Sequence, residues 1–296
     1  MSVLQIVILA AIQGLAELLP VSSSAHVILA QRLMGLDPAA PEMTFLLVML
    51  HTGTMFSVLV YFWARWKRWL FPAGSTGELP AGSTGMRFLR QLVVATGCTG
   101  VIGLGLKIFI EHVILEGAPG HPKAEVEELF RNLPLIAAAL LAAGILIMAA
   151  GLWAAEPKAA AFDMANSVLI GIVQGFCLPF RGFSRSGATI STALFCGIRR
   201  DLAEDFSFAL AVLLTPPVIL IELRRLLMAS ASRGAAGPSL AAQILPGLLG
   251  MVASFLAGLV ALRWLSSWLE KGRWRYFGYY CVVFSVVVFV GHRLGL

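Results

Sequence analysis

Residues 13–26 read QGLAELLPVSSSAH, an apolar segment that is broken by a proline and three consecutive serines. A second broken segment, QGFCLPFRGFSRSGAT, occupies residues 174–189. In both segments Gln-Gly and Leu-Pro precede a turn that is rich in hydroxyl residues, and proline ends a helix at such a turn. The chain therefore resembles itself at an offset of about 160 residues.

The resemblance between the two halves extends downstream, where Phe45 and Thr52 are matched by Phe208 and Thr215. Three expected spanning helices separate the copies, and an odd number turns the second copy upside down relative to the first. Such inverted-topology repeats, with interrupted helices meeting near the midplane, are typical of many transport folds. We expect one polytopic membrane domain over residues 1–296, with one repeat at about 1–154 and the other at about 164–293.

The composition excludes a soluble enzyme, a disordered protein and a disulfide scaffold. Of the 296 residues only 13% are charged and 58% are hydrophobic, whereas a soluble domain has about 25% charged residues. The uncharged runs suit a bilayer, which needs roughly 20 residues per spanning helix. These runs are residues 43–64, 91–106, 132–155, 206–221, 234–262 and 276–291. We expect an all-α integral membrane fold with these six spans and two re-entrant helix-turn-helix segments.

The loop charges predict an orientation, because cytoplasmic loops carry an excess of Lys and Arg. The connection at residues 65–90 is basic and is assigned to the cytoplasm, the acidic connection at residues 111–131 to the outside, and both chain ends also to the outside. Arg224, Arg225 and Arg233 fit this orientation poorly. The net charge of +6 is attributed to anionic membrane lipids rather than to nucleic acid, because the basic residues flank membrane helices.

The first broken segment concentrates reactive side chains. Gln13 and Glu17 are four residues apart and share a helix face. A carboxylate at membrane depth is costly, so Glu17 is expected to have a partner or a metal ion. After the proline, three serines can cap the next helix, and His26 can carry a proton near neutral pH. The serines are Ser22, Ser23 and Ser24.

The second broken segment has the composition of an anion site. Arg185 offers a planar fork for phosphate oxygens, the hydroxyls of Ser184, Ser186 and Thr189 are donors, and a helix N-terminus is expected near Gly187. A structural explanation also exists, in which serines cap helices and Glu17 forms an ion pair with Arg185. An acid, a base, a nucleophile and a cationic clamp together favour a phosphoester or diphosphate site. For His51, on a spanning helix, structural and functional roles both stay open.

The motifs at Gln13, Glu17 and Pro20 to His26, and at Gly182 to Thr189, resemble those of the undecaprenyl-diphosphatase family of bacitracin-resistance membrane phosphatases. The resemblance runs over nearly the whole chain. It implies hydrolysis of undecaprenyl diphosphate to undecaprenyl phosphate and phosphate, which recycles the lipid carrier of peptidoglycan synthesis. It also implies a location in the bacterial cytoplasmic membrane, a site that opens to the periplasmic face, and assistance by a divalent cation, Mg²⁺ or Ca²⁺.

The resemblance also implies residue roles. Glu17 with Gln13 would help hold the metal, Ser23 or His26 would drive the attack, and Arg185 would clamp the diphosphate. The expected substrate-binding residues are Ser22, Ser24, Ser184, Ser186 and Thr189. Whether Ser23 is a covalent nucleophile or orients a water stays open. The chain departs from the family at Arg181, where proline is common, and whether this second guanidinium contacts the diphosphate or extends away from it stays open.

Two other classes of function are alternatives to an enzyme. Inverted repeats with broken helices suit a transporter or flippase of a prenyl phosphate lipid. A purely structural membrane subunit is disfavoured by the cost of burying unsatisfied polar groups. Glycine-rich stretches such as residues 97–105 can pack helices within one chain or between the two copies of a homodimer, so the oligomeric state also stays open.

Overall fold

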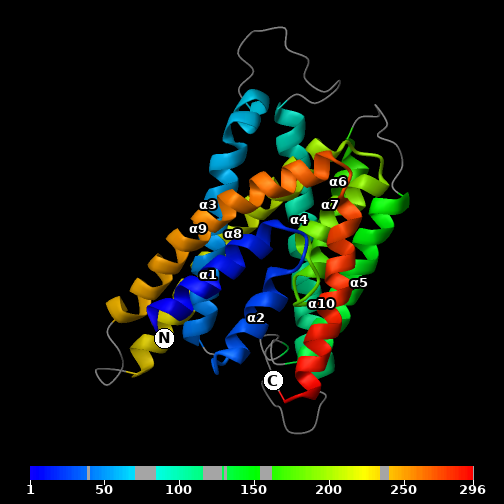
Figure 1. The fold of residues 1–296 in the computed structure, drawn as a ribbon. Coiled ribbons are helices and arrows are strands. Elements are labelled where there is room, and N and C mark those ends of the chain that lie inside the picture. The colour runs from blue at the N-terminus through cyan, green and yellow to red at the C-terminus, as the bar shows by residue number, and fades with distance from the viewer. Residues whose placement is uncertain are drawn as a thin grey trace.

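The structure is a computed structural model that describes residues 1–38, 41–70, 85–115, 129, 132–153, 162–233 and 240–295. Every long element among these residues is a helix (Figure 1). Six helices in the described ranges are long and apolar enough to cross a membrane, which confirms the six predicted spans. They are α3 (Pro41–Leu70), α4 (Gly85–Phe109), α5 (Leu133–Trp153), α8 (Arg200–Arg233), α9 (Leu240–Glu270) and α10 (Trp274–Arg293). A π-helical turn, η1 (Ile110–Leu115), continues α4.

Each broken segment forms two shorter helices joined by a turn. The first consists of α1 (Val3–Leu18) and α2 (Ser23–Leu33), and the second of α6 (Met164–Cys177) and α7 (Arg185–Phe195). A serine caps the second helix of each pair: Ser22 accepts from the Ala25 N–H and Ser184 from the Gly187 N–H. Both halves of the chain thus contain two short helices followed by three long ones.

The contacts between helices differ between the two halves. The repeat relates α3 to α8 and α9 to α4, so the pair α3 and α9 corresponds to the pair α8 and α4. The helices α3 and α9 pack closely along each other, whereas α8 and α4 touch much less. Close packing relies on small residues elsewhere: a Cβ on Gly278 of α10 would lie 2.7 Å from the Gly144 carbonyl oxygen of α5. The loose contact leaves space between α4 and α8 beside the two broken segments.

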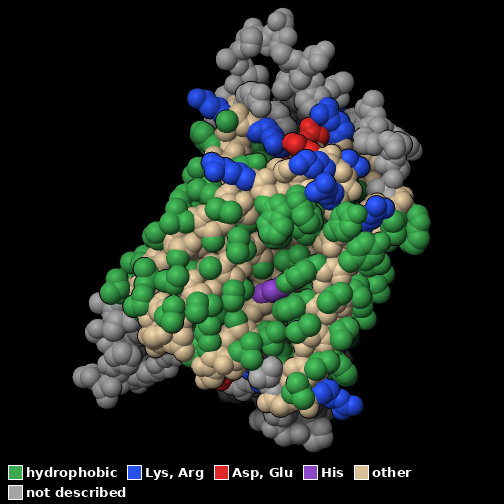
Figure 2. Space-filling view, in the orientation of Figure 1, with side chains coloured by type: hydrophobic (Ala, Val, Ile, Leu, Met, Phe, Trp, Pro, Cys, Tyr) green, Lys and Arg blue, Asp and Glu red, His purple; other side chains and the backbone are tan. Residues whose placement is uncertain are grey.

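The surface matches a membrane protein. Hydrophobic side chains cover the middle of the molecule, whereas Lys and Arg side chains gather at one end (Figure 2). Lipid-facing side chains such as Val101 and Leu220 are 73% and 67% exposed. Both chain termini lie at the end opposite the main group of basic side chains (Figure 1), in agreement with the predicted orientation, which places both termini on one side.

Candidate active site

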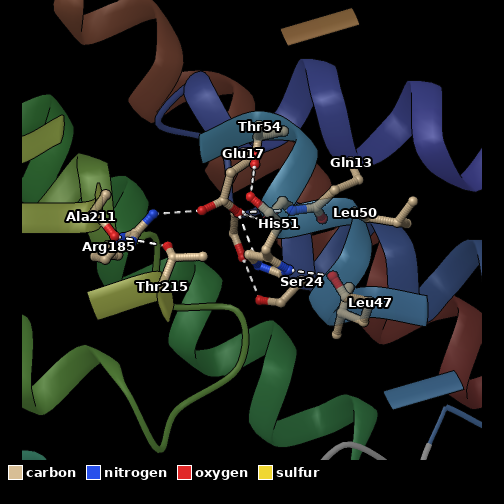
Figure 3. Close-up of polar contacts among 12 residues, drawn as sticks. Gln13, Glu17, Ser24, Leu47, Leu50, His51, Thr54, Arg185, Ala211 and Thr215 are labelled. Atoms are coloured by element: carbon tan, nitrogen blue, oxygen red, sulfur yellow. Dashed lines mark hydrogen bonds and ion pairs between the residues drawn. The ribbon is translucent and has the colours of Figure 1, made fainter. Parts of the chain in front are cut away.

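The Glu17 carboxylate is the centre of a polar group between the two broken segments (Figure 3). It lies in the last turn of α1, and its side chain is only 10% exposed. One oxygen, Oε1, accepts from Nη2 of Arg185 at the start of α7. The other, Oε2, accepts from the Ser23 hydroxyl of α2 and from Nε2 of Gln13, the latter at 3.1 Å. These donors explain how a carboxylate is accommodated at this depth, because a buried charge needs partners.

His51 reaches the same carboxylate from α3. Its Nε2 lies 3.3 Å from Oε2 of Glu17, and its Nδ1 lies 2.7 Å from the Leu47 carbonyl oxygen. A carbonyl and an ionised carboxylate only accept hydrogen bonds. Each ring nitrogen therefore faces an acceptor, and Nε2 donates to Glu17 when it carries the proton. Four elements, α1, α2, α3 and α7, thus meet at one side chain.

The turns of the two broken segments touch each other directly. Ser22 has a left-handed backbone, with φ of 66°, and its hydroxyl lies 3.3 Å from that of Ser24. The Ser24 hydroxyl in turn accepts from the Gly182 N–H at 3.1 Å. Gly182 has φ of +100°, and a Cβ there would lie 2.3 Å from the Ile136 carbonyl oxygen. Only glycine allows this close approach between the second turn and α5.

A cavity of about 480 Å³ opens beside Glu17. Its polar lining comes from both broken segments, α3 and α8, and its apolar lining comes from α3, α4, α8 and the second broken segment. The polar lining residues include Glu17, Ser22, Ser23, Ser24, Thr44, His51, Ser184, Arg185, Ser186 and Thr215, and the apolar ones include Leu47, Leu104, Leu178, Phe180, Leu214, Val218 and Ile221. Two further cations, Lys107 and Arg181, also line the cavity. Its lining suits a ligand in which an anionic group is attached to an apolar chain.

The structure places His26 away from this group. Its ring stacks on Phe284 with centroids 3.9 Å apart, and its Nε2 lies 2.7 Å from the Tyr280 hydroxyl. Its Nδ1 lies 2.8 Å from the Ser22 carbonyl oxygen, which ties the ring to the start of α2. His26 therefore lines a second, aromatic cavity of about 420 Å³ bordered by α1, α9 and α10. The histidine that contacts Glu17 is His51.

Thr189 also points elsewhere. Its hydroxyl lies 2.6 Å from that of Ser207 in α8 and donates to the Arg185 carbonyl oxygen at 2.9 Å. The Thr189 side chain is fully buried, and its hydroxyl contacts lie within α7 and with α8. Of the five predicted substrate-binding residues, Ser22 and Ser24 of the first turn and Ser184 and Ser186 of the second line the cavity, whereas Thr189 does not.

Few ligand atoms are available here for the expected divalent cation. Within the described ranges no three His, Cys, Asp or Glu side chains gather as a metal cluster. Glu17 offers one carboxylate, and Oε1 of Gln13 is buried without a hydrogen-bond partner. Mg²⁺ is often held by one or two carboxylates together with substrate phosphates and water. Glu17 lines the cavity and could meet a cation that takes most of its ligands from a bound diphosphate, whereas Gln13 is buried behind Glu17 and does not line the cavity.

Comparison with known proteins identifies close relatives along the whole chain. Residues 6–287 match the family described as bacitracin resistance protein BacA. Undecaprenyl-diphosphatase 2 of Acinetobacter baylyi is 55% identical over 289 residues, covering 97% of each chain. The undecaprenyl-diphosphatases of Korarchaeum cryptofilum and Desulfatibacillum aliphaticivorans are 30% and 33% identical, and at least 97% of each chain is covered.

Proposed function

Because this chain belongs to the family of the bacitracin resistance protein BacA, we infer that it is an undecaprenyl-diphosphatase of the membrane. It hydrolyses undecaprenyl diphosphate to undecaprenyl phosphate and inorganic phosphate. The observation that carries this function at the level of residues is the contact of one carboxylate, Glu17, with both a serine hydroxyl and an arginine. A proton acceptor, a nucleophile and a cationic clamp are what phosphoanhydride cleavage requires.

We propose that the diphosphate binds at the polar end of the cavity. The helices α2 and α7 both begin there, and helix N-termini attract anions. Arg185, Arg181 and Lys107 supply positive charge along the same lining. The prenyl chain is proposed to leave along the apolar lining between α4 and α8, where Leu104 and Val218 are exposed to lipid.

In the proposed reaction Ser23 Oγ attacks the terminal phosphorus. A bond forms between Oγ and phosphorus, the phosphoanhydride bond breaks, and undecaprenyl phosphate leaves with the bridging oxygen. The hydroxyl proton goes to Glu17, which already accepts it in a hydrogen bond. Arg185 balances the negative charge on the phosphoryl oxygens. Water then attacks the phosphorus of the phosphoserine, the bond between phosphorus and Oγ breaks, Ser23 Oγ takes back the proton from Glu17, and inorganic phosphate leaves.

A direct attack by water gives the same products without a phosphoserine. In that path Glu17 accepts a proton from the water, and Ser23 holds the water in place by its hydroxyl. Trapping a phosphorylated Ser23 peptide by acid quenching and mass spectrometry separates the two paths. The proposed divalent cation, held by Glu17 together with the substrate, would neutralise charge on the diphosphate.

We propose that the chain resides in the bacterial inner membrane with its site open to the periplasm. The cavity residues of α3 lie near its start, those of α4 near its end and those of α8 around its middle. In Figure 1 these parts lie toward the end of the molecule where both termini are found. We assign that end to the periplasm by the positive-inside bias, because Lys and Arg side chains gather at the opposite end on the face shown in Figure 2.

The test is phosphate release from a long-chain prenyl diphosphate by purified protein in detergent. We expect Ser23→Ala, Glu17→Gln and Arg185→Lys each to reduce release by about 100-fold or more, since each removes a group that acts in the transition state. Thermal unfolding would show that the variants remain folded. We also expect chelation by EDTA to stop release and added Mg²⁺ or Ca²⁺ to restore it. A folded wild-type protein that binds the lipid but releases no phosphate would refute the enzyme and favour the transporter.

A further inference from the structure

The two oxygens of Glu17 are used unequally. Among the residues that the structure describes, Arg185 is the only partner of Oε1, whereas Oε2 is shared by Ser23, Gln13 and His51. In the proposed function Arg185 also clamps the diphosphate, so its guanidinium must divide between substrate and carboxylate. A carboxylate that was held only by Arg185 would move with it when substrate binds. Contacts to Oε2 that do not involve the substrate are needed to keep Glu17 on the Ser23 hydroxyl.

His51 is suited to this task because its position is fixed from several sides. The bond from Nδ1 to the Leu47 carbonyl oxygen orients the ring. The same part of α3 is packed tightly on α9: the Ser254 hydroxyl donates to the Leu50 carbonyl oxygen at 2.8 Å, and a Cβ on Gly53 would lie 2.1 Å from the Met251 carbonyl oxygen. A side chain on so rigid a helix holds its partner with little freedom.

We propose that His51 is a positioning residue for phosphate release, which holds the Glu17 carboxylate against the Ser23 hydroxyl while Arg185 engages the diphosphate. This inference rests on the proposed function. It assigns His51 to the transfer step and not to the binding of the headgroup. A hydrogen-bond donor at the position of Nε2 is needed to hold the Glu17 carboxylate, and a side chain that only fills the volume of the ring does not hold it.

Two substitutions separate the donor from the volume. His51→Gln keeps an N–H donor near the position of Nε2, whereas His51→Leu fills similar space without a donor. We expect His51→Leu to lower kcat by about 10- to 100-fold, because a misplacement of about 1 Å has effects of this size, with KM changed by less than about threefold. His51→Gln should recover most of kcat. His112→Leu is the matched control, since His112 makes the same kind of contact, to the Ile108 carbonyl oxygen, outside the cavity lining.

A double-mutant cycle tests the contact itself. In the Glu17→Gln background, His51→Leu should cause little further loss of activity, and the midpoints of thermal unfolding of the two single variants should not add. Equal activity of His51→Gln and His51→Leu, or additive unfolding midpoints, would overturn the proposal. If the wild type releases no phosphate, the proposed function fails. In that case the double-mutant cycle measured by thermal unfolding still tests the contact between His51 and Glu17. Additive changes in the unfolding midpoint would show that His51 does not hold Glu17.

Discussion

Replacing Gly182 by alanine should impair both folding and catalysis, because this residue joins the second turn to α5. Its φ of +100° is unfavourable for an L residue by about 1–2 kcal/mol. The added Cβ would lie 2.3 Å from the Ile136 carbonyl oxygen, so the turn must move by about 1 Å to reach an ordinary contact. Overpacking of this kind costs about 1–3 kcal/mol. The free energy of unfolding should fall by about 2–5 kcal/mol in total.

The same movement affects the site. The Gly182 N–H donates to Ser24, and Arg185 follows three residues later. A displacement of about 1 Å there should lower phosphate release by about 100-fold. Gly35→Ala is the control: Gly35 has φ of +69°, but a Cβ there meets no described atom within 4 Å. It should lose about 1–2 kcal/mol of stability and no activity. If thermal unfolding and phosphate release were equal for the two variants, the reasoning from the contact with Ile136 would be wrong.

Three more substitutions have defined outcomes. Arg65 of α3 lies 3.1 Å from Asp205 and 3.6 Å from Glu204, and both carboxylates are buried. Arg65→Ala should lower the free energy of unfolding by about 2 kcal/mol, since it removes the cation beside two buried carboxylates. The loss stays below that of a fully buried pair because the Arg65 side chain is 29% exposed, and an unchanged unfolding midpoint would contradict this. Lys107→Ala and Arg181→Ala should raise KM for the prenyl diphosphate by about tenfold each, with kcat changed little, because charge-assisted contacts to phosphate contribute about 1.5–3 kcal/mol. Steady-state kinetics that show a fall in kcat at constant KM would refute a role in binding.

Much of the fold could be predicted because bilayer thickness sets the length of apolar runs. The six spans followed from runs without charge, and the helix ends at Leu18 and Cys177 followed from the prolines just after them. The contact between Glu17 and Gln13 could also be predicted, since the two residues are one helical turn apart. That both turns meet followed from the cost of irregular backbone in lipid.

The remaining part of the site depends on how distant helices pack. The sequence shows His51 as the one histidine in its apolar run, but its contact with Glu17 requires that α3 lie beside α1. His26 follows Ser23 by three residues, yet stacking on Phe284 of α10 directs its ring into the other cavity. Thr189 is similar, because Ser207 of α8 takes its hydroxyl. Such choices are made by residues of other helices, whose packing no local pattern specifies.

The loose contact between α4 and α8 has a consequence for kinetics. Leu104, Val218 and Ile221 line the cavity and are also 60%, 46% and 54% exposed at the lipid face, so the cavity is continuous with the surrounding hydrocarbon. A substrate that enters there diffuses in two dimensions and never crosses bulk water. Its effective concentration is then its mole fraction among the amphiphiles. Adding detergent at constant substrate molarity should slow the enzyme by surface dilution alone.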